Sequence, residues 1–137
     1  MRKPIFKYED GHATCIATDE MGRKFSGEAW CSPEDEDMMS ELVGCTIAEY
    51  RAQIAAAATY RNDLRIRLAA LNQLYYSMKH SSQFNPKSDA AKMLYRQIKM
   101  TQSDLDIAIH QLAVLRLDLF EYINDKDALY KELRKRR

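Results

Sequence analysis

A run of apolar side chains spaced three and four residues apart restricts the fold of this chain more than any other feature. It begins near Cys45 and continues to about His80. One heptad position holds Ile47, Ile54, Leu68 and Tyr75, with Arg61 among them, and its partner position holds Tyr50, Ala57, Leu64, Leu71 and Met78. Such spacing predicts a long helix with a coiled-coil-like apolar seam.

The same spacing resumes after one polar interruption, SSQFNPKSDA at residues 81–90. Its apolar positions are Leu94, Ile98, Leu105, Ala108, Leu112, Leu115, Leu119, Tyr122, Leu129 and Leu133. A short polar segment between two long helical patterns predicts an antiparallel helical hairpin, with its turn at 81–88.

The second predicted helix carries more apolar side chains than one seam needs. The additional stripe consists of Ile109, Val114, Leu117, Phe120 and Ile123. Two helices share a single interface, so this stripe requires another partner. Part of it can lie under the N-terminal segment, and the remainder predicts a homodimer or higher homo-oligomer formed through the helices.

The first 30 residues have the pattern of strands. KPIFKYE, HATCIAT and RKFSGEAW are each rich in β-branched or aromatic residues. Asp10-Gly11 separates the first two and is a strong signal for a tight hairpin, while residues 19–22 form a second turn ending in glycine. We expect a three-stranded antiparallel meander, which is marginal alone and must pack on a helix.

Residues 32–44 predict a short acidic helix between the meander and the hairpin. Ser32 suits the N-cap, Pro33 the first helical position, and the acids at 34–37 the N-terminal dipole, while Gly44 can end the helix. The acids could also bind a metal, although their spacing is not that of a calcium loop. The predicted class is therefore α+β, with residues 1–44 holding the meander and short helix and residues 45–137 forming the hairpin as a single structural unit.

Composition and charge exclude several classes of protein. Residues 1–44 carry 5 Lys/Arg and 10 Asp/Glu, a net −5, and the remaining 16 and 10 give residues 45–137 a net +6. An acidic head and a basic body favour an anionic ligand or contacts between subunits over general coating of nucleic acid. No apolar run has the length of a membrane span, and the N-terminus has no apolar core like that of a signal peptide. The three cysteines are odd in number and form no CxxC pair, which fits an intracellular protein with reduced thiols.

The sequence contains no recognisable catalytic or cofactor-binding motif. It has no phosphate-binding loop, no Gly-rich dinucleotide turn and no GxSxG. His12, His80 and His110 are far apart, and no pair has the spacing of metal ligands on a helix. We therefore expect no enzyme, no resident metal and no cofactor.

Basic residues on the two helices are the first candidates for ligand binding. Arg61 occupies a seam position, so it must meet an anion or an acid, and Arg65 lies one turn further along. The alternative partner for Arg61 is an internal carboxylate such as Asp106 or Asp118. In the second helix, Arg96 forms a basic face with Lys92 and Lys99, and the alternative is that this face is merely solvated.

The turn between the helices combines the groups that a planar anionic ligand requires. Aromatic rings can stack on a base, an amide can read a base edge or a ribose hydroxyl, and a cation beside a helix N-terminus suits phosphate. The aromatic rings are those of Tyr75, Tyr76 and Phe84, and the amide is that of Asn85. Lys87 supplies the cation, and Ser88 caps the helix N-terminus. The alternative is that Phe84 plugs the end of the hairpin while Asn85, Pro86 and Ser88 form an ordinary turn and cap.

Four stretches of the chain resemble the phage anti-Thoeris sponge family, in its earlier-described type with a small β-module and long helices. They are YEDGHATC, GRKFSGEAWCSPEDEDMMSELVGCTIAEYRAQI, YYSMKHSSQFNPKS and YINDKDALYKELRKRR. The resemblance implies a protein of the host cytoplasm that sequesters cyclic ADP-ribose isomers made by TIR-domain enzymes, without turnover. It also implies an oligomer with pockets where helices of neighbouring subunits meet, and a possible capacity for cyclic oligonucleotides.

The physical pattern assigns roles within this expectation. Arg61 and Arg65 are expected to hold the pyrophosphate, Phe84 to stack on the base, and Asn85 to read the ribose or base. Tyr75, Tyr76, Lys87, Ser88 and Arg96 complete the candidate set. The main alternative function is a helical adaptor or inhibitor that binds a host protein through its apolar stripe; a nucleic-acid binder and an enzyme that cleaves the signal come after it.

Overall fold

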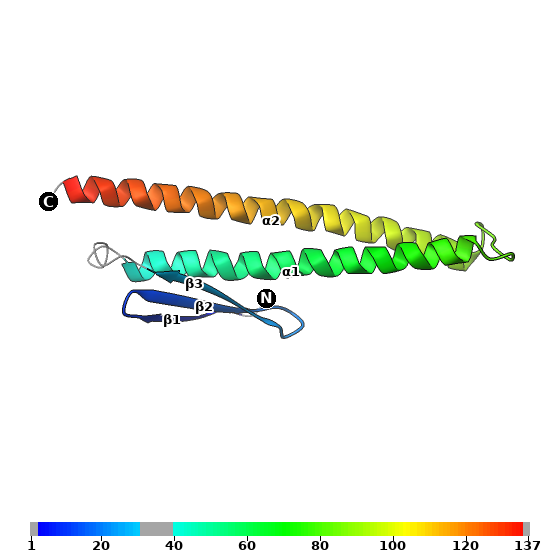
Figure 1. The fold of residues 1–137 in the computed structure, drawn as a ribbon, viewed down its shortest axis with the longest axis horizontal. Helices are drawn as coiled ribbons and strands as arrows, with labels where there is room; N and C mark the ends of the chain where they lie inside the picture. Colours follow the sequence, from blue (N-terminus) through cyan, green and yellow to red (C-terminus); the bar gives the residue numbers. More distant parts are fainter. Residues whose placement is uncertain (1–2, 31–39, 136–137) are drawn as a thin grey trace. The chain divides into compact units, whose positions relative to one another are not determined.

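A computed structural model of the chain describes residues 3–30 and 40–135, in which three strands precede two long helices (Figure 1). The strands are β1 (Ile5–Glu9), β2 (His12–Thr18) and β3 (Lys24–Trp30), and the helices are α1 (Ser40–Lys79) and α2 (Asp89–Lys135). The strands pair in the order β1-β2-β3, both pairs antiparallel. The predicted α+β class, with a β-meander followed by a helical hairpin, is confirmed.

The first hairpin turn forms where Asp10-Gly11 predicts it. Both residues have positive φ, 50° and 78°, and Glu9 pairs directly with His12 across the turn. Positive φ at both central positions gives a turn whose twist matches that of the flanking strands.

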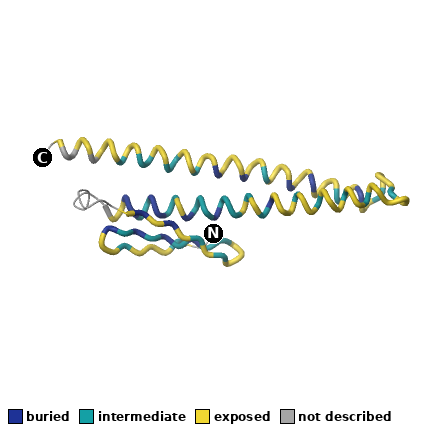
Figure 2. Tube along the Cα trace, viewed as in Figure 1, coloured by how far each residue is buried: buried dark blue, intermediate teal, exposed yellow. Residues whose placement is uncertain are grey.

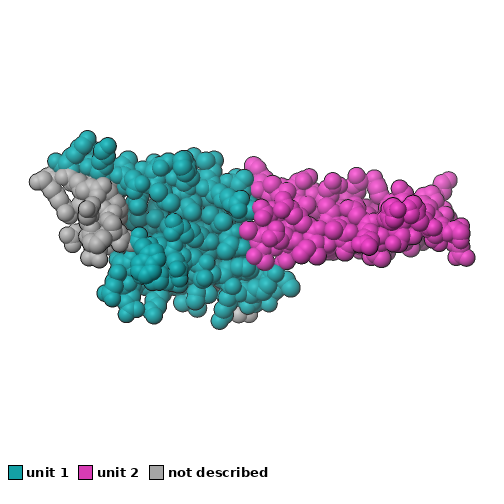
Figure 3. All heavy atoms as spheres, in the orientation of Figure 1, with its two compact units in different colours: residues 1–57, 112–137 teal, residues 58–111 magenta. Residues whose placement is uncertain are grey.

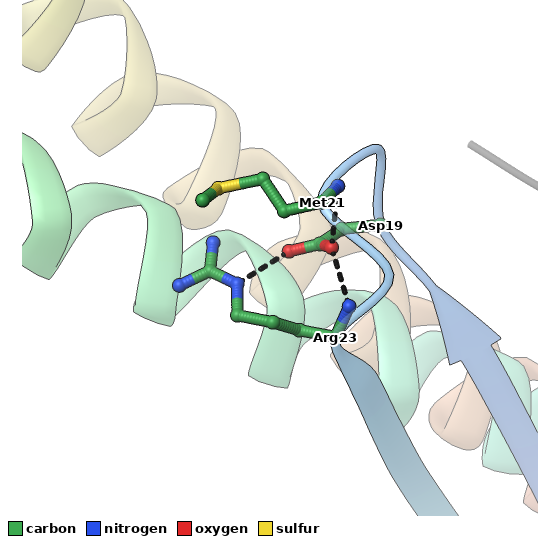
Figure 4. Close-up of polar contacts among 3 residues, drawn as sticks. All are labelled: Asp19, Met21 and Arg23. Atoms are coloured by element: carbon green, nitrogen blue, oxygen red, sulfur yellow. Dashed lines mark hydrogen bonds and ion pairs between the residues drawn. The ribbon is translucent and has the colours of Figure 1, made fainter.

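The second turn is held by a single carboxylate (Figure 4). Asp19 Oδ1 accepts hydrogen bonds from the backbone N–H groups of Met21 at 3.0 Å and Arg23 at 2.9 Å, and Oδ2 lies 2.8 Å from Arg23 Nε. Desolvation acts to raise the pKa of Asp19, but the hydrogen bonds and charge from Arg23, with the Met21 amide, together hold it below its ordinary value. This short network closes the loop between β2 and β3.

One face of the sheet packs on the first part of α1. Along β2 the burial alternates, and the buried positions are Ala13, Cys15 and Ala17. With Ala29 they join four residues of α1 in one core: Val43, Ile47, Ala48 and Ala52. Most of these side chains are small, so the sheet and the helix can approach closely.

Gly27 marks the closest approach of the sheet to α1. A Cβ atom there would lie 2.9 Å from Arg51 Cβ and closer still to backbone atoms of Ala48 and Ala52. Beside it, Arg51 Nη1 donates a hydrogen bond of 2.6 Å to the backbone oxygen of Glu28. Glycine at position 27 is therefore required by space rather than by its backbone conformation.

The second half of α2 packs against the same core. Leu119, Tyr122 and Ile123 are partly buried against it, and the rings of Tyr50 and Tyr122 lie 6.0 Å apart. Ile123, a member of the extra apolar stripe, is therefore partly buried against this core.

The expected end of a short helix at Gly44 is wrong. Gly44 is buried inside α1, which begins at Ser40 and continues to Lys79. A glycine inside a helix costs about 1 kcal/mol relative to alanine, and packing by its neighbours Val43 and Ile47 in the core offsets that cost. Ser32, Pro33 and the acids at 34–37 lie outside the described residues.

The chain divides into two compact units (Figure 3). Unit 1 comprises residues 1–57 and 112–137, and unit 2 comprises residues 58–111. Unit 1 therefore contains the sheet with the beginning of α1 and the end of α2. Unit 2 contains the remainder of both helices and the turn that joins them.

Much of α2 remains exposed, as Figure 2 shows along its length. Of the predicted extra stripe, Ile109 and Val114 are each 41% exposed, Leu117 is 55% and Phe120 is 63%. Self-association through these side chains stays a prediction. Within residues 3–30 and 40–135, no helix combines the length and apolar character needed to cross a membrane.

Candidate functional site

The segment between α1 and α2 is a hydrogen-bonded turn that ends in a helix cap. Asn85 Oδ1 accepts a 3.0 Å hydrogen bond from the backbone N–H of Lys87, which is an Asx-turn. Ser88 Oγ accepts a 3.2 Å hydrogen bond from the backbone N–H of Ala91, as an N-cap residue does. Both side-chain oxygens thus perform the ordinary roles that the sequence left as the alternative to ligand binding.

Aromatic rings from three segments gather at this end of unit 2. Tyr75 of α1 lies 6.2 Å from Phe84 of the turn, edge to face, and 6.2 Å from Tyr95 of α2, tilted by 50°. Phe84 is half-buried against Tyr75, so it closes the end of the hairpin. The pair formed by Tyr75 and Tyr95, in contrast, borders a hollow in the surface.

A groove of about 570 Å³, open to solvent, lies beside the tyrosine pair. Its lining residues are Tyr75, Pro86, Ala91, Lys92, Tyr95, Arg96 and Lys99. Lys92, Arg96 and Lys99 follow one another at intervals of four and three residues, so α2 presents them along the groove. Three cations and two aromatic rings therefore meet in one place.

Cations also lie over both rings. Lys79 Nζ is 5.3 Å from the centre of the Tyr75 ring, and Lys99 Nζ is 5.4 Å from the centre of the Tyr95 ring. Both distances are within the range of cation–π attraction. Lys99 lines the groove itself, whereas Lys79 contacts the Tyr75 ring without being part of the lining.

A second hollow, of about 290 Å³, adjoins the groove and shares Tyr75, Tyr95 and Lys99 with it. Its other lining residues are Leu68, Asn72, Ile98 and Gln102. We call the first the cationic groove and the second the amide hollow.

No protein-family model, curated protein or solved structure matches this chain.

The structure brings together only part of the residue set expected from the sequence. Tyr75 and Arg96 line the cationic groove, and Phe84 contacts Tyr75. Tyr76 is 63% exposed and lies edge-on to His80, with ring centres 4.1 Å apart, and it does not line the groove. Lys87 is exposed in the turn and contributes its backbone N–H to the Asx-turn.

Arg61 and Arg65 lie on α1 outside both hollows. Arg61 is half-buried, and its Nη2 lies 3.4 Å from Asn62 Oδ1. In the described part of the chain its buried Nε has no hydrogen-bond acceptor and no carboxylate forms an ion pair with it. The internal partner considered from the sequence, Asp106 or Asp118, is thus not observed among these residues, and Arg65 is exposed.

Sequence reasoning missed Tyr95, and it treated Lys92 and Lys99 as part of a solvated face. The stretch KMLYRQIK contained the signal, because a tyrosine lies three residues after one lysine and four before another. On a helix that spacing puts the ring and both cations on neighbouring positions.

Within the described residues, neither metal-ligating side chains nor the buried thiol of Cys15 forms a competing site. Among residues 3–30 and 40–135, no cluster of three or more His, Cys, Asp and Glu could hold a metal ion. Burial raises the pKa of the Cys15 thiol, and the nearby Glu49 and Cys45 raise it further. A buried thiol kept protonated is a poor nucleophile.

Proposed function

We propose that this protein binds a cyclic ADP-ribose-type nucleotide and withholds it without turnover. In this role it would act in the host cytoplasm as a phage counter-defence protein that blocks TIR-dependent Thoeris immunity. The observation that carries the proposal is the cationic groove, in which Lys92, Arg96 and Lys99 lie beside the Tyr75–Tyr95 ring pair.

The chemistry of the groove suits a nucleotide with a pyrophosphate. Three cations can neutralise the negative charges of two phosphates, and Arg96 can hold phosphate oxygens through two N–H groups at once. The tyrosine faces can stack on adenine, which contributes about 1–3 kcal/mol per base in nucleic-acid complexes. The volume of about 570 Å³ falls within the range typical of small-molecule sites.

The groove lining favours retention of a ligand over its hydrolysis. None of the described side chains that line it is a carboxylate or an imidazole. Those are the groups that most often act as general bases near neutral pH.

An open groove alone would release its ligand quickly, so tight sequestration requires that something cover the bound ligand. A second copy of the chain, held through the exposed apolar stripe of α2, would supply that cover. Cyclic oligonucleotides are a second ligand class within this proposal.

A second candidate function is favoured by the exposure of Leu117 and Phe120 on α2. Large exposed apolar side chains mark surfaces that bind other proteins. In this alternative the protein is a helical adaptor or inhibitor that docks on a host protein, and the cationic groove holds no nucleotide.

Isothermal titration with purified cyclic ADP-ribose isomers tests the proposal. Tight binding is expected, with intact ligand recovered after the complex is denatured; recovery of a cleaved product would mean an enzyme instead. The double variant Arg96→Glu/Lys99→Glu should weaken binding by about 100-fold or more, because two phosphate partners become repulsive. Arg116→Glu/Lys131→Glu, which makes the same charge change at two exposed positions of α2 outside the groove, is the matched control.

The outcome separates the two functions. If no isomer binds the wild-type protein, sequestration is excluded. Specific retention of a host protein by the wild-type chain would then support the adaptor function. If an isomer binds equally well to both double variants, sequestration survives but the cationic groove is not its site.

A further inference from the structure

The amide hollow differs in chemistry from the cationic groove that it adjoins. Two carboxamides line it, Asn72 from α1 and Gln102 from α2, and both side chains are exposed. Among the described residues that line it, Lys99 is the one cation, and it is shared with the groove. The two hollows therefore offer a ligand a charged part and a neutral hydrogen-bonding part, side by side.

The apolar part of the lining gives the hollow a surface for a flat ring. Ile98 is buried and Leu68 is half-buried, and both line it together with the two shared tyrosines. Its volume of about 290 Å³ is roughly the lower end of the range for small-molecule sites. The hollow is thus suited to one base, with the phosphates and ribose in the larger groove.

A carboxamide is the side chain that matches the edge of adenine. It presents a donor and an acceptor together, and adenine offers an N–H donor at N6 beside an acceptor at N7. In hypoxanthine an oxygen acceptor replaces the N6 amino group, so the same pair of hydrogen bonds cannot form with the same amide orientation.

We propose that Asn72 and Gln102 form a base-reading subsite that makes the protein selective for adenine. This inference rests on the proposed function, because the phosphates held by Lys92, Arg96 and Lys99 would bring the base to the amide hollow. The shared Tyr75 and Tyr95 would stack on the same base, where the two hollows adjoin.

The test compares two ligands that differ only in the base. The cyclic ADP-ribose isomer that the wild-type protein binds most tightly is titrated alongside its hypoxanthine counterpart. The wild-type protein is expected to bind the adenine ligand about 10-fold more tightly, which is the scale of discrimination by a good amide–base pair. Asn72→Ala and Gln102→Ala should each weaken binding of the adenine ligand while leaving the hypoxanthine ligand within about 2-fold, so that the preference declines.

Gln73→Ala and Gln97→Ala are matched controls, since both side chains are exposed on the same two helices and line neither hollow. A wild-type preference that persists in both Asn72→Ala and Gln102→Ala overturns the subsite, and so does the absence of any preference in the wild-type protein. Both results leave sequestration standing. Failure of the wild-type protein to bind any isomer removes the proposed function and this inference together.

Discussion

The core of unit 1 and the cationic groove of unit 2 are built from opposite kinds of residue. Where the sheet meets α1, small side chains such as Ala13, Ala48 and Ala52 are buried, and Gly27 leaves no room for a Cβ. Beside the groove, large and charged side chains are exposed: Tyr95 is 50% exposed, and Arg96 and Lys99 are exposed as well.

This difference separates folding from binding. Unit 1 uses residues whose size is fixed by close packing, so substitutions there should change stability. In the groove, the side chains of Lys92, Tyr95, Arg96 and Lys99 are exposed, and exposed charges contribute little to stability. Substitutions there should change ligand affinity and leave unfolding unaltered.

Gly27→Ala is expected to cause the largest loss of stability, because it disrupts the packing of unit 1. The added methyl group would meet backbone atoms of Ala48 and Ala52, which cannot rotate away as a side chain can. Overpacking of this kind should lower the free energy of unfolding by about 3 kcal/mol. Urea denaturation followed by circular dichroism measures the loss.

Gly22→Ala is the control for that variant. Gly22 has a φ of +83° with no atom within 4 Å of an added Cβ, so only backbone strain applies. That strain should cost about 1 kcal/mol. Equal losses of unfolding free energy in the two variants would show that the close contact at Gly27 does not determine the loss in Gly27→Ala.

Tyr95→Ala should have the next largest effect, on affinity rather than on stability. Loss of the ring removes stacking and the cation–π contact with Lys99, which should weaken nucleotide binding by about 10-fold. Tyr95→Phe should bind normally because the ring remains. Tyr76→Ala, an exposed tyrosine outside the groove, is the matched control, and an equal effect there would argue against a specific stack.

Arg61→Leu should stabilise the protein by about 1 kcal/mol. Its buried Nε has no acceptor in the described part of the chain, and such a donor is costly to keep from water. Arg65→Leu, at an exposed position, should have little effect on thermal unfolding. The same variants test the sequence-based assignment of the pyrophosphate to these arginines: unchanged affinity would leave the phosphate contact to the cationic groove.

The sequence predicts the local features of the fold better than it predicts the site. Asp10-Gly11 specifies a turn by its own backbone preference, and Ser88 caps α2 by its own hydroxyl, so each can be read from a few residues. The groove could not be derived in that way. It depends on which face of α2 meets Tyr75, and that choice is made by side chains on both helices together.

Two candidates from the turn have local partners in the structure. Phe84 and Asn85 have the chemistry of ligand contacts, but the turn itself uses the ring against Tyr75 and the side-chain oxygen for Lys87. Short polar side chains such as that of asparagine readily hydrogen-bond to neighbouring backbone groups in turns, so their chemistry alone does not identify a ligand contact.

The smallest expected effect concerns Asp19 and acid stability. The pKa of this carboxyl is lower in the folded chain than its ordinary value near 4. Its contribution to stability is therefore present above that ordinary value and is lost as the pH falls through the lower folded pKa. Asp19→Asn should be slightly less stable than the wild-type protein at neutral pH and should lose less stability on acidification below about pH 4. Thermal unfolding between pH 7 and pH 2 measures the slope of stability against pH for both proteins. Glu20→Gln, at an exposed neighbouring position, is the control. Parallel slopes for Asp19→Asn and the wild-type protein would show that the contacts from Met21 and Arg23 close the β2–β3 loop without favouring the charged carboxylate.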